Sequence, residues 1–139
     1  MRTVIPYLIV FVVAACNTGP QPLVYGKDAC HTCKMTLVDN RFGAELITSK
    51  GKVFKFDDVN CLVRFYKSGE VDAQSILITD YSKPGELIDA TLATYVMSDD
   101  VRSPMASNAA VFANKEEAEK FNVTLKGKLM TWNDILTEF

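Results

Sequence analysis

Two cysteines and a methionine near the start of the chain form the group of side chains best suited to chemistry. Cys30 and Cys33 are three residues apart, and Met35 follows two residues later. Two thiolates at this spacing can bind one ion from a single turn of chain, and soft thiolate and thioether ligands select Cu(I) over hard cations. Zinc sites use cysteine and histidine and seldom methionine. The pattern therefore predicts a soft-metal site, for which His31, inside the loop, is a further candidate ligand.

A second methionine stands in an unusual place. Met105 lies in the polar segment 103–108 (SPMASN). Methionine more often fills gaps in a hydrophobic core, but a polar loop has no core to fill. We therefore predict that Met105 is a ligand too. Met97 ends an apolar segment instead and is predicted to be a core residue.

Other uses of the cysteine pair fit less well. A c-type haem site needs CxxCH, but residue 34 is lysine. A zinc knuckle needs a second pair, and in the body only Cys61 remains. A thioredoxin-like site places its pair between a buried strand and a helix N-terminus, which lowers a thiol pKa, and residues 23–28 make a poor buried strand. A redox-active or structural disulfide stays open, because exported proteins meet oxidising surroundings.

Three residues further on have simpler interpretations. Cys61 lies in an apolar run with helical spacing and is predicted to be a small buried hydrophobe. Asp57 and Asp58 come directly before this run and are predicted to cap the helix. They are less well explained as paired catalytic acids, because the sequence pairs no nucleophile or base with them.

The N-terminus has the pattern of an export signal. A basic start is followed by an uncharged apolar run, residues 4–15, and by Cys16. Such a run is shorter than the roughly 20 residues of a membrane span. Residues 13–16 (VAAC) resemble a bacterial lipobox, so residues 1–15 are predicted to be a lipoprotein signal peptide and Cys16 the lipidated residue that binds the membrane. Residues 16–29 are then the lipidated N-terminus and tether, and residues 30–139 the folded body.

Charge and composition limit the partners. The 139 residues carry a formal net charge of −2, without a basic block. Nucleic-acid binding normally needs a basic face, so no nucleic-acid partner is expected.

The body alternates between strand-like and helix-like segments, which predicts an α+β fold. The first half contains strands, a tight turn and a helix that begins after Asp58. The second half repeats this order, with Asn114 capping its helix. Two related ββαβ lobes, at about 30–82 and 86–139, are predicted, with one irregular α+β domain as the alternative. The expected strands are 43–48, 53–56, 75–81, 87–97, 109–112 and 128–132, the last leading into a short turn if it ends early; the expected helices are 59–66 and 115–121; and 98–108 is a loop.

Together these pieces resemble the NosL family, the lipoproteins accessory to nitrous oxide reductase. The resemblance covers almost the whole chain after the tether. It is carried by these motifs in order: Cys16 of the lipobox, Cys30-x-x-Cys33-x-Met35, Gly43-Ala44-Glu45, Phe56-Asp57-Asp58 with Cys61-Leu62, Thr79-Asp80-Tyr81, Ile88-Asp89-Ala90, and Ser103-Pro104-Met105 followed by Phe112.

The resemblance implies both a fold and a function. The fold would be two ββαβ lobes similar to a part of organomercurial lyase. The function would be Cu(I) binding and delivery to nitrous oxide reductase, with help from an ABC-transporter complex, and no enzymatic activity. The protein would be anchored facing the periplasm, and Asn17 after the lipidated cysteine favours the outer membrane.

One departure from the family pattern affects the ligand set. Many members carry Met-Gly-His where this chain has Met105-Ala106-Ser107. If that histidine binds copper in the family, the third ligand here must come from elsewhere, and His31, a cysteine of the pair or Met35 could serve.

The alternatives to this function belong to different classes. They are a thiol–disulfide oxidoreductase, a copper-binding lipoprotein that serves another exported cuproenzyme, and an enzyme that cleaves carbon–metal bonds.

Overall fold

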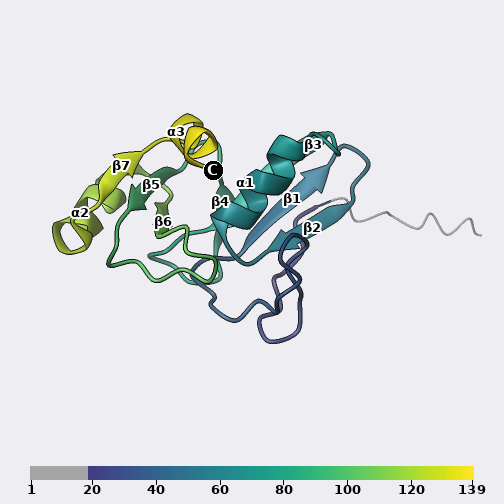
Figure 1. Cartoon of the computed structure of the whole chain (residues 1–139), viewed down its shortest axis with the longest axis horizontal. Helices are drawn as coiled ribbons and strands as arrows, with labels where there is room; N and C mark the ends of the chain where they lie inside the picture. The colour runs from purple at the N-terminus through teal and green to yellow at the C-terminus, as the bar shows by residue number, and fades with distance from the viewer. Residues whose placement is uncertain (1–18) are drawn as a thin grey trace, which may run out of the picture.

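The computed structural model describes residues 19–139, so the predicted signal peptide (1–15) and Cys16 lie outside the described residues. Figure 1 shows two sheets side by side, with the chain passing from the first to the second about halfway along the sequence. Within residues 19–139, none of the helices is long and apolar enough to span a membrane. The fold is mixed, with two antiparallel sheets and three helices, as the α+β class requires.

The first sheet has four antiparallel strands in the order β2-β1-β3-β4. Their bounds are β1 Ala44–Thr48, β2 Val53–Phe56, β3 Ala73–Thr79 and β4 Leu87–Asp89. Every residue of β1 is buried, because helix α1 (Val59–Ser68) contacts the sheet and the N-terminal segment approaches β1 as well. In that segment, the Gln21 N–H donates to Glu45 Oε2 at 3.1 Å.

The predicted turn and helix of the first half are confirmed. Gly51 has φ of 79° in the turn between β1 and β2, a conformation that glycine adopts without steric cost. Helix α1 ends at Gly69, which is left-handed (φ 68°) and donates its N–H to the Tyr66 carbonyl. Such a glycine is a common helix terminator.

The second sheet has three antiparallel strands in the order β6-β5-β7. Its elements are β5 Thr94–Met97, β6 Ala109–Phe112, α2 Lys115–Leu125, β7 Lys128–Met130 and the final helix α3 Trp132–Glu138. The predicted cap of α2 is confirmed, since the Asn114 side chain accepts from the Glu117 N–H at 2.9 Å. After β7 the chain forms a helix rather than more strand, because Thr131 and Asp134 make a reciprocal capping box.

The prediction of one long strand over 87–97 is wrong. The segment forms β4 and β5, which belong to different sheets. Asp89 interrupts it, because its Oδ1 accepts from the Thr91 N–H at 2.8 Å and from the Thr91 hydroxyl at 2.6 Å. Such side-chain bonds to nearby backbone favour a turn over a continuing strand.

The two halves share an order of elements. β1, β2, α1 and β3 follow one another in the first half, as do β5, β6, α2 and β7 in the second. In each sheet the first of these strands lies between the other two. The main core joins both sheets, since Leu46 and Phe56 belong to the same buried cluster as Tyr95 and Met130.

Candidate metal centre

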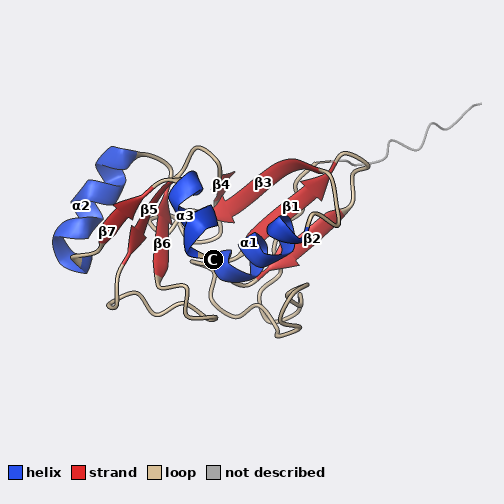
Figure 2. Cartoon of the chain, turned by 45° about the horizontal axis from the view of Figure 1, so that its top comes forward, coloured by secondary structure: helices blue, strands red, loops and turns tan. Residues whose placement is uncertain are grey.

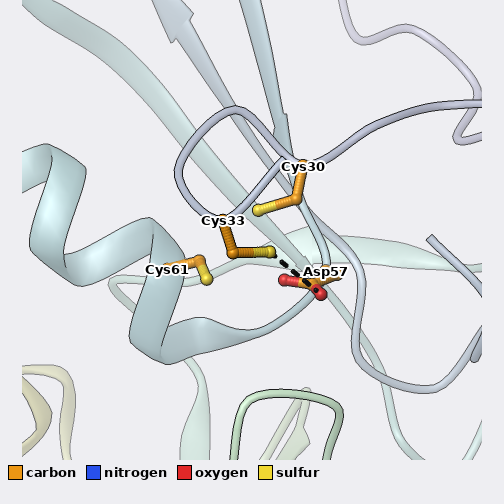
Figure 3. A group of neighbouring side chains, drawn as sticks. All are labelled: Cys30, Cys33, Asp57 and Cys61. Carbon is orange, nitrogen blue, oxygen red and sulfur yellow. Dashed lines mark hydrogen bonds between the residues drawn. The ribbon is translucent and has the colours of Figure 1, made fainter. Parts of the chain in front are cut away.

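The loop that carries the cysteine pair is closed by its own backbone. The Cys30 N–H donates to the Met35 carbonyl at 2.8 Å, and the Lys34 N–H donates to the Cys30 carbonyl at 3.0 Å. Lys34 adopts a left-handed φ of 66° to complete the turn. The turn places the thiols of Cys30 and Cys33 close together, as Figure 3 shows.

Two further bonds fasten this loop to the first sheet and to its helix. The His31 N–H donates to the Lys55 carbonyl on β2 at 2.8 Å. The Thr32 hydroxyl donates to the Cys61 carbonyl on α1 at 2.9 Å. The loop therefore lies where β2 ends and α1 begins.

The connection from β2 to α1 supplies two more functional groups. Asp57 follows the last residue of β2, and Cys61 lies in the first turn of α1. The two are four residues apart, and helical side chains lean toward the helix N-terminus. The Cys61 thiol is thus directed toward Asp57 and toward the loop.

Four side chains meet at this point. One ligand atom from each of Cys30, Cys33, Asp57 and Cys61 lies within 4.8 Å of all the others (Figure 3). The Cys33 thiol donates to Asp57 Oδ2 at 3.4 Å. All three cysteines are free thiols; Cys30 and Cys61 are buried, whereas Cys33 is only half-buried.

The electrostatics of the four groups are linked. A hydrogen bond from the Cys61 thiol, helped by backbone N–H groups of Cys33 and Asp57, lowers the pKa of Cys30 to about 4 against the opposing effect of burial. The hydrogen bond with Cys30 and burial raise the pKa of Cys61. Burial raises the pKa of Cys33 and of Asp57. Metal ligands bind in their deprotonated forms, so a cation held by these four groups would compete with protons for them.

The cluster is chemically suited to a soft or borderline metal ion. Three sulfur atoms and one carboxylate converge, and Oδ1 of Asp57 is buried with no hydrogen-bond partner among the described residues. A buried polar atom without a partner is costly, and a metal ion at this point would satisfy it.

The two predicted methionine ligands differ in burial. Met35 is 56% exposed and lies at the end of the cysteine loop. Met105 packs against the core that contains Cys30 and Cys61. Its backbone is held at the start of α1, because its N–H donates to Asp58 Oδ2 at 2.9 Å and its carbonyl accepts from the Asn60 amide at 3.3 Å.

The structure does not bring His31 into the cluster. Its ring packs edge-on against Phe54 and Phe65, with centroids 4.6 and 4.8 Å away. Burial, with smaller contributions from Lys34 and Lys52, lowers the pKa of His31.

The sequence predicts structural roles for two members of the cluster, Asp57 and Cys61. Cys61 is buried as predicted, but its thiol faces three other ligand-type groups. The spacing of one helical turn between Asp57 and Cys61, directly after a strand, was the signal that could have paired them. What the sequence does not show is that this pair faces the loop of Cys30.

The predicted capping by Asp57 and Asp58 is wrong in its contacts. Asp58 stands at the N-cap position of α1, but its side chain makes no cap hydrogen bond. Its Oδ2 instead accepts from the Ser103 hydroxyl at 2.8 Å and from the N–H groups of Met105 and Ser107. Figure 2 shows that the β5–β6 loop and the loop ahead of β1 lie on the same side of the molecule.

Comparison with known proteins assigns the family. The NosL family profile matches residues 23–139. A crystal structure of the copper chaperone NosL from Shewanella denitrificans is similar, with a TM-score of 0.72, 25% identity, and coverage of 84% of this chain and 94% of that chain. No curated protein matches the sequence significantly. Because the profile spans nearly the whole described chain, this protein belongs to the NosL family.

Proposed function

We propose that this protein binds Cu(I) and acts as a copper chaperone. The observation that carries the proposal is the convergence of Cys30, Cys33, Cys61 and Asp57 within 4.8 Å. Thiolates are the preferred protein ligands of Cu(I). The similar protein from Shewanella denitrificans is itself described as a copper chaperone.

The exposure of the ligands suits a carrier that must release its metal. Cys30 and Cys61 are 0% and 1% exposed, whereas Cys33 is half-buried and Met35 is exposed. A partner's thiol can reach the ion from the side of Cys33, while the buried pair retains it until exchange is complete. Met35 and Met105 would be secondary thioether ligands at the opening.

The cluster also explains how copper could be bound without the Met-Gly-His motif. Ser107, at the position of the histidine, is buried, and its N–H bonds to Asp58. The additional donors come instead from Cys61 and Asp57, which lie within reach of the cysteine pair.

The destination of the copper is part of the proposal. We propose delivery to nitrous oxide reductase, together with its ABC-transporter complex, from a lipid anchor at Cys16 facing the periplasm, in the outer membrane. The Gln21 N–H is held by Glu45, so only a short stretch of chain separates Cys16 from the folded body. A tether of this kind raises the effective concentration at a membrane-bound partner.

We propose that the two halves of the fold are related lobes. Their shared order of strands and helix supports two ββαβ lobes, at about 30–82 and 86–139. The likeness of these lobes to a part of organomercurial lyase is proposed from the family resemblance alone. The handover itself needs ligand exchange only, and we propose no enzymatic activity.

The test is Cu(I) titration of the full chain in detergent against a competing chromophoric chelator. A Cys16→Ser background removes any thiol outside the cluster. Replacing Cys30 and Cys33 together by serine should weaken Cu(I) binding by about 100-fold or more, roughly 2.7 kcal/mol. Met105→Ala and Met35→Ala should each cost less, and Met97→Leu, a methionine outside the cluster, should cost nothing. Full-strength binding by the cysteine double variant carrying Met35→Ala would rule out this site.

The rival functions need separate measurements. A thiol–disulfide oxidoreductase would reduce insulin with a dithiol donor, and we expect no such activity. The cuproenzyme served is identified by the genes beside this one and by N₂O reduction in a denitrifying host that lacks its own copy. Loss of membrane association in Cys16→Ser, with no palmitate labelling, would verify the anchor.

A further inference from the structure

The accessible side chains of the two halves of the body carry net charges of opposite sign. Residues 30–82 contain seven Lys and Arg residues and seven Asp and Glu residues. Four of these acids are buried, which leaves three at the surface; the buried ones are Glu45, Asp57, Asp58 and Asp80. Residues 86–139 contain five Lys and Arg residues against nine Asp and Glu residues, none of them buried. The accessible side chains therefore carry a net charge of +4 in the first half and −4 in the second.

Part of this positive charge gathers around His31, in the cysteine loop. The Lys34 ammonium donates to the His31 carbonyl. On one side of His31 lies a hollow of about 270 Å³ that Lys52 and Lys55 also line. On the other side lies a hollow of about 290 Å³ that Arg64 lines. We call His31 and these four cations the basic face.

Most cations of the basic face have no carboxylate partner within the protein. Lys55 pairs with Asp28 at 2.7 Å. The other three cations take part in none of the ion pairs among residues 19–139. Glu70 borders the same hollow as Arg64 but forms no ion pair with it. Three positive charges are therefore available to a partner.

The basic face adjoins the most accessible thiol of the cluster. Cys33 is half-buried, whereas Cys30 and Cys61 are buried. Its neighbour in sequence, Thr32, lines the hollow that Arg64 borders, and its other neighbour belongs to the basic face. A protein that approaches Cys33 comes within range of these charges, because the Debye length is about 8 Å at physiological ionic strength.

We infer that the basic face docks an acidic surface of the protein that accepts the metal. Opposite charges on two partners raise the rate of encounter and fix their orientation. The same acidic surface repels residues 86–139, so the first half turns toward the acceptor. An anionic membrane would also attract the basic face, but a lipid surface accepts no metal and would cover Cys33. The inference rests on the proposed function, because it describes how the copper acceptor is recognised.

The probe is nitrous oxide reductase with its ABC-transporter complex in detergent, and the full chain with Cys16→Ser is the common background. Binding of the metal-free chain and the rate of Cu(I) transfer are measured at about 20 mM and about 500 mM salt. Lys52→Glu together with Arg64→Glu should lower the affinity and the transfer rate about tenfold or more at low salt, and less than about twofold at high salt.

Two further pairs of substitutions serve as controls. Lys52→Gln with Arg64→Gln removes the charges without reversing them and should have a smaller effect in the same direction. Lys120→Glu with Lys128→Glu makes the same change in charge at two exposed positions of the second half, and should alter either quantity less than about threefold. The Cu(I) affinity of every variant should equal that of the parent, and thermal melting checks that each one folds.

The outcomes separate this inference from the proposed function. Absence of binding to the probe, or binding and transfer that do not respond to the charge reversal, would overturn the inference while Cu(I) titration leaves the copper function standing. Absence of Cu(I) binding, with docking that still depends on Lys52 and Arg64, would remove the copper function and leave the docking surface. If the reversal abolished only binding to phosphatidylglycerol vesicles, or only self-association in sedimentation, the face would belong to a membrane or to a second copy, and the inference would be overturned.

Discussion

The carboxylate of Asp58 and the backbone N–H of Met105 are joined by a 2.9 Å hydrogen bond across 47 positions of sequence. The same oxygen accepts from Ser103 and Ser107, so one buried atom organises the loop between β5 and β6. Asp58 directly follows Asp57, which belongs to the candidate metal centre. The β5–β6 loop, which contains Met105, is thereby fixed beside the end of β2, where the four-residue cluster lies.

Because Asp58 holds the β5–β6 loop through these hydrogen bonds, changing Asp58 should reduce both the stability of the protein and the order of the loop. Asp58→Ala leaves the Ser103 hydroxyl and two N–H groups without their acceptor, and each charge-assisted bond contributes about 1.5–3 kcal/mol. We expect a destabilisation of about 3 kcal/mol in urea unfolding and faster hydrogen exchange at the Met105 and Ser107 amides. Asp100→Ala, at an exposed position of the same loop, is the control and should change neither. An unchanged hydrogen-exchange rate at the Met105 amide in Asp58→Ala would contradict this role of Asp58.

Replacing Ala106 by glycine should stabilise this loop. Its φ is 56°, and a left-handed conformation costs an L-residue about 1–2 kcal/mol. Glycine avoids this cost but loses about 0.4–1 kcal/mol through the unfolded chain. Ala106→Gly should therefore raise the free energy of unfolding by about 0.5–1 kcal/mol in urea. A lower value than the parent's would show that the loop does not need a left-handed residue here.

The unequal burial of the three thiols predicts their order of alkylation. Without metal, iodoacetamide should modify Cys33 before Cys61, because Cys33 is half-buried whereas Cys61 is buried. With one equivalent of Cu(I), all three should be protected, as read by peptide mass spectrometry. In urea the three should react at comparable rates. Modification of Cys61 as fast as Cys33 in the folded protein would mean that the pocket is more open than the structure shows.

The buried carboxyl group of Glu45 should make the free energy of unfolding depend on pH. Its carboxyl is buried on β1, with Oε1 unpartnered among the described residues, and burial raises its pKa above the ordinary value of 4.5. The folded state then holds the proton more tightly, so this contribution to stability is complete below the unfolded pKa and is lost as pH rises through the folded pKa.

The matching measurement is urea unfolding between about pH 4 and pH 7. Glu45→Gln cannot ionise, so it should match the parent at the acid end and exceed it by about 1 kcal/mol at neutral pH. Glu138→Gln, at an exposed position, should follow the parent throughout. A Glu45→Gln variant that keeps the parent's pH profile would place the dependence elsewhere.

Local features of the fold follow from the sequence because they depend on neighbouring residues. Asn114 caps α2, Gly69 ends α1, and the alternating segments become β1 and β2. The predicted strand over 87–97 is wrong because Asp89 hydrogen-bonds to its neighbour Thr91, and this turn interrupts a segment that is otherwise rich in β-branched residues.

The cysteine pair illustrates how far spacing alone can lead. It predicts that Cys30 and Cys33 share one turn and bind a soft metal, since two thiols three residues apart can converge on one ion. Spacing could not decide the direction of His31, which the tertiary structure turns against Phe54 and Phe65.

By itself the sequence determined the cysteine loop, most of the strands and helices, and the resemblance to NosL. Only the tertiary structure decided that Asp57 and Cys61 meet the loop and that Asp58 turns from capping its helix to holding Met105. The physical reason is that these groups are brought together by the bonds of His31 to β2 and of Thr32 to α1, and by the packing of a distant loop. Such long-range contacts leave no period in the sequence, because they depend on how whole elements pack rather than on the residues beside each ligand.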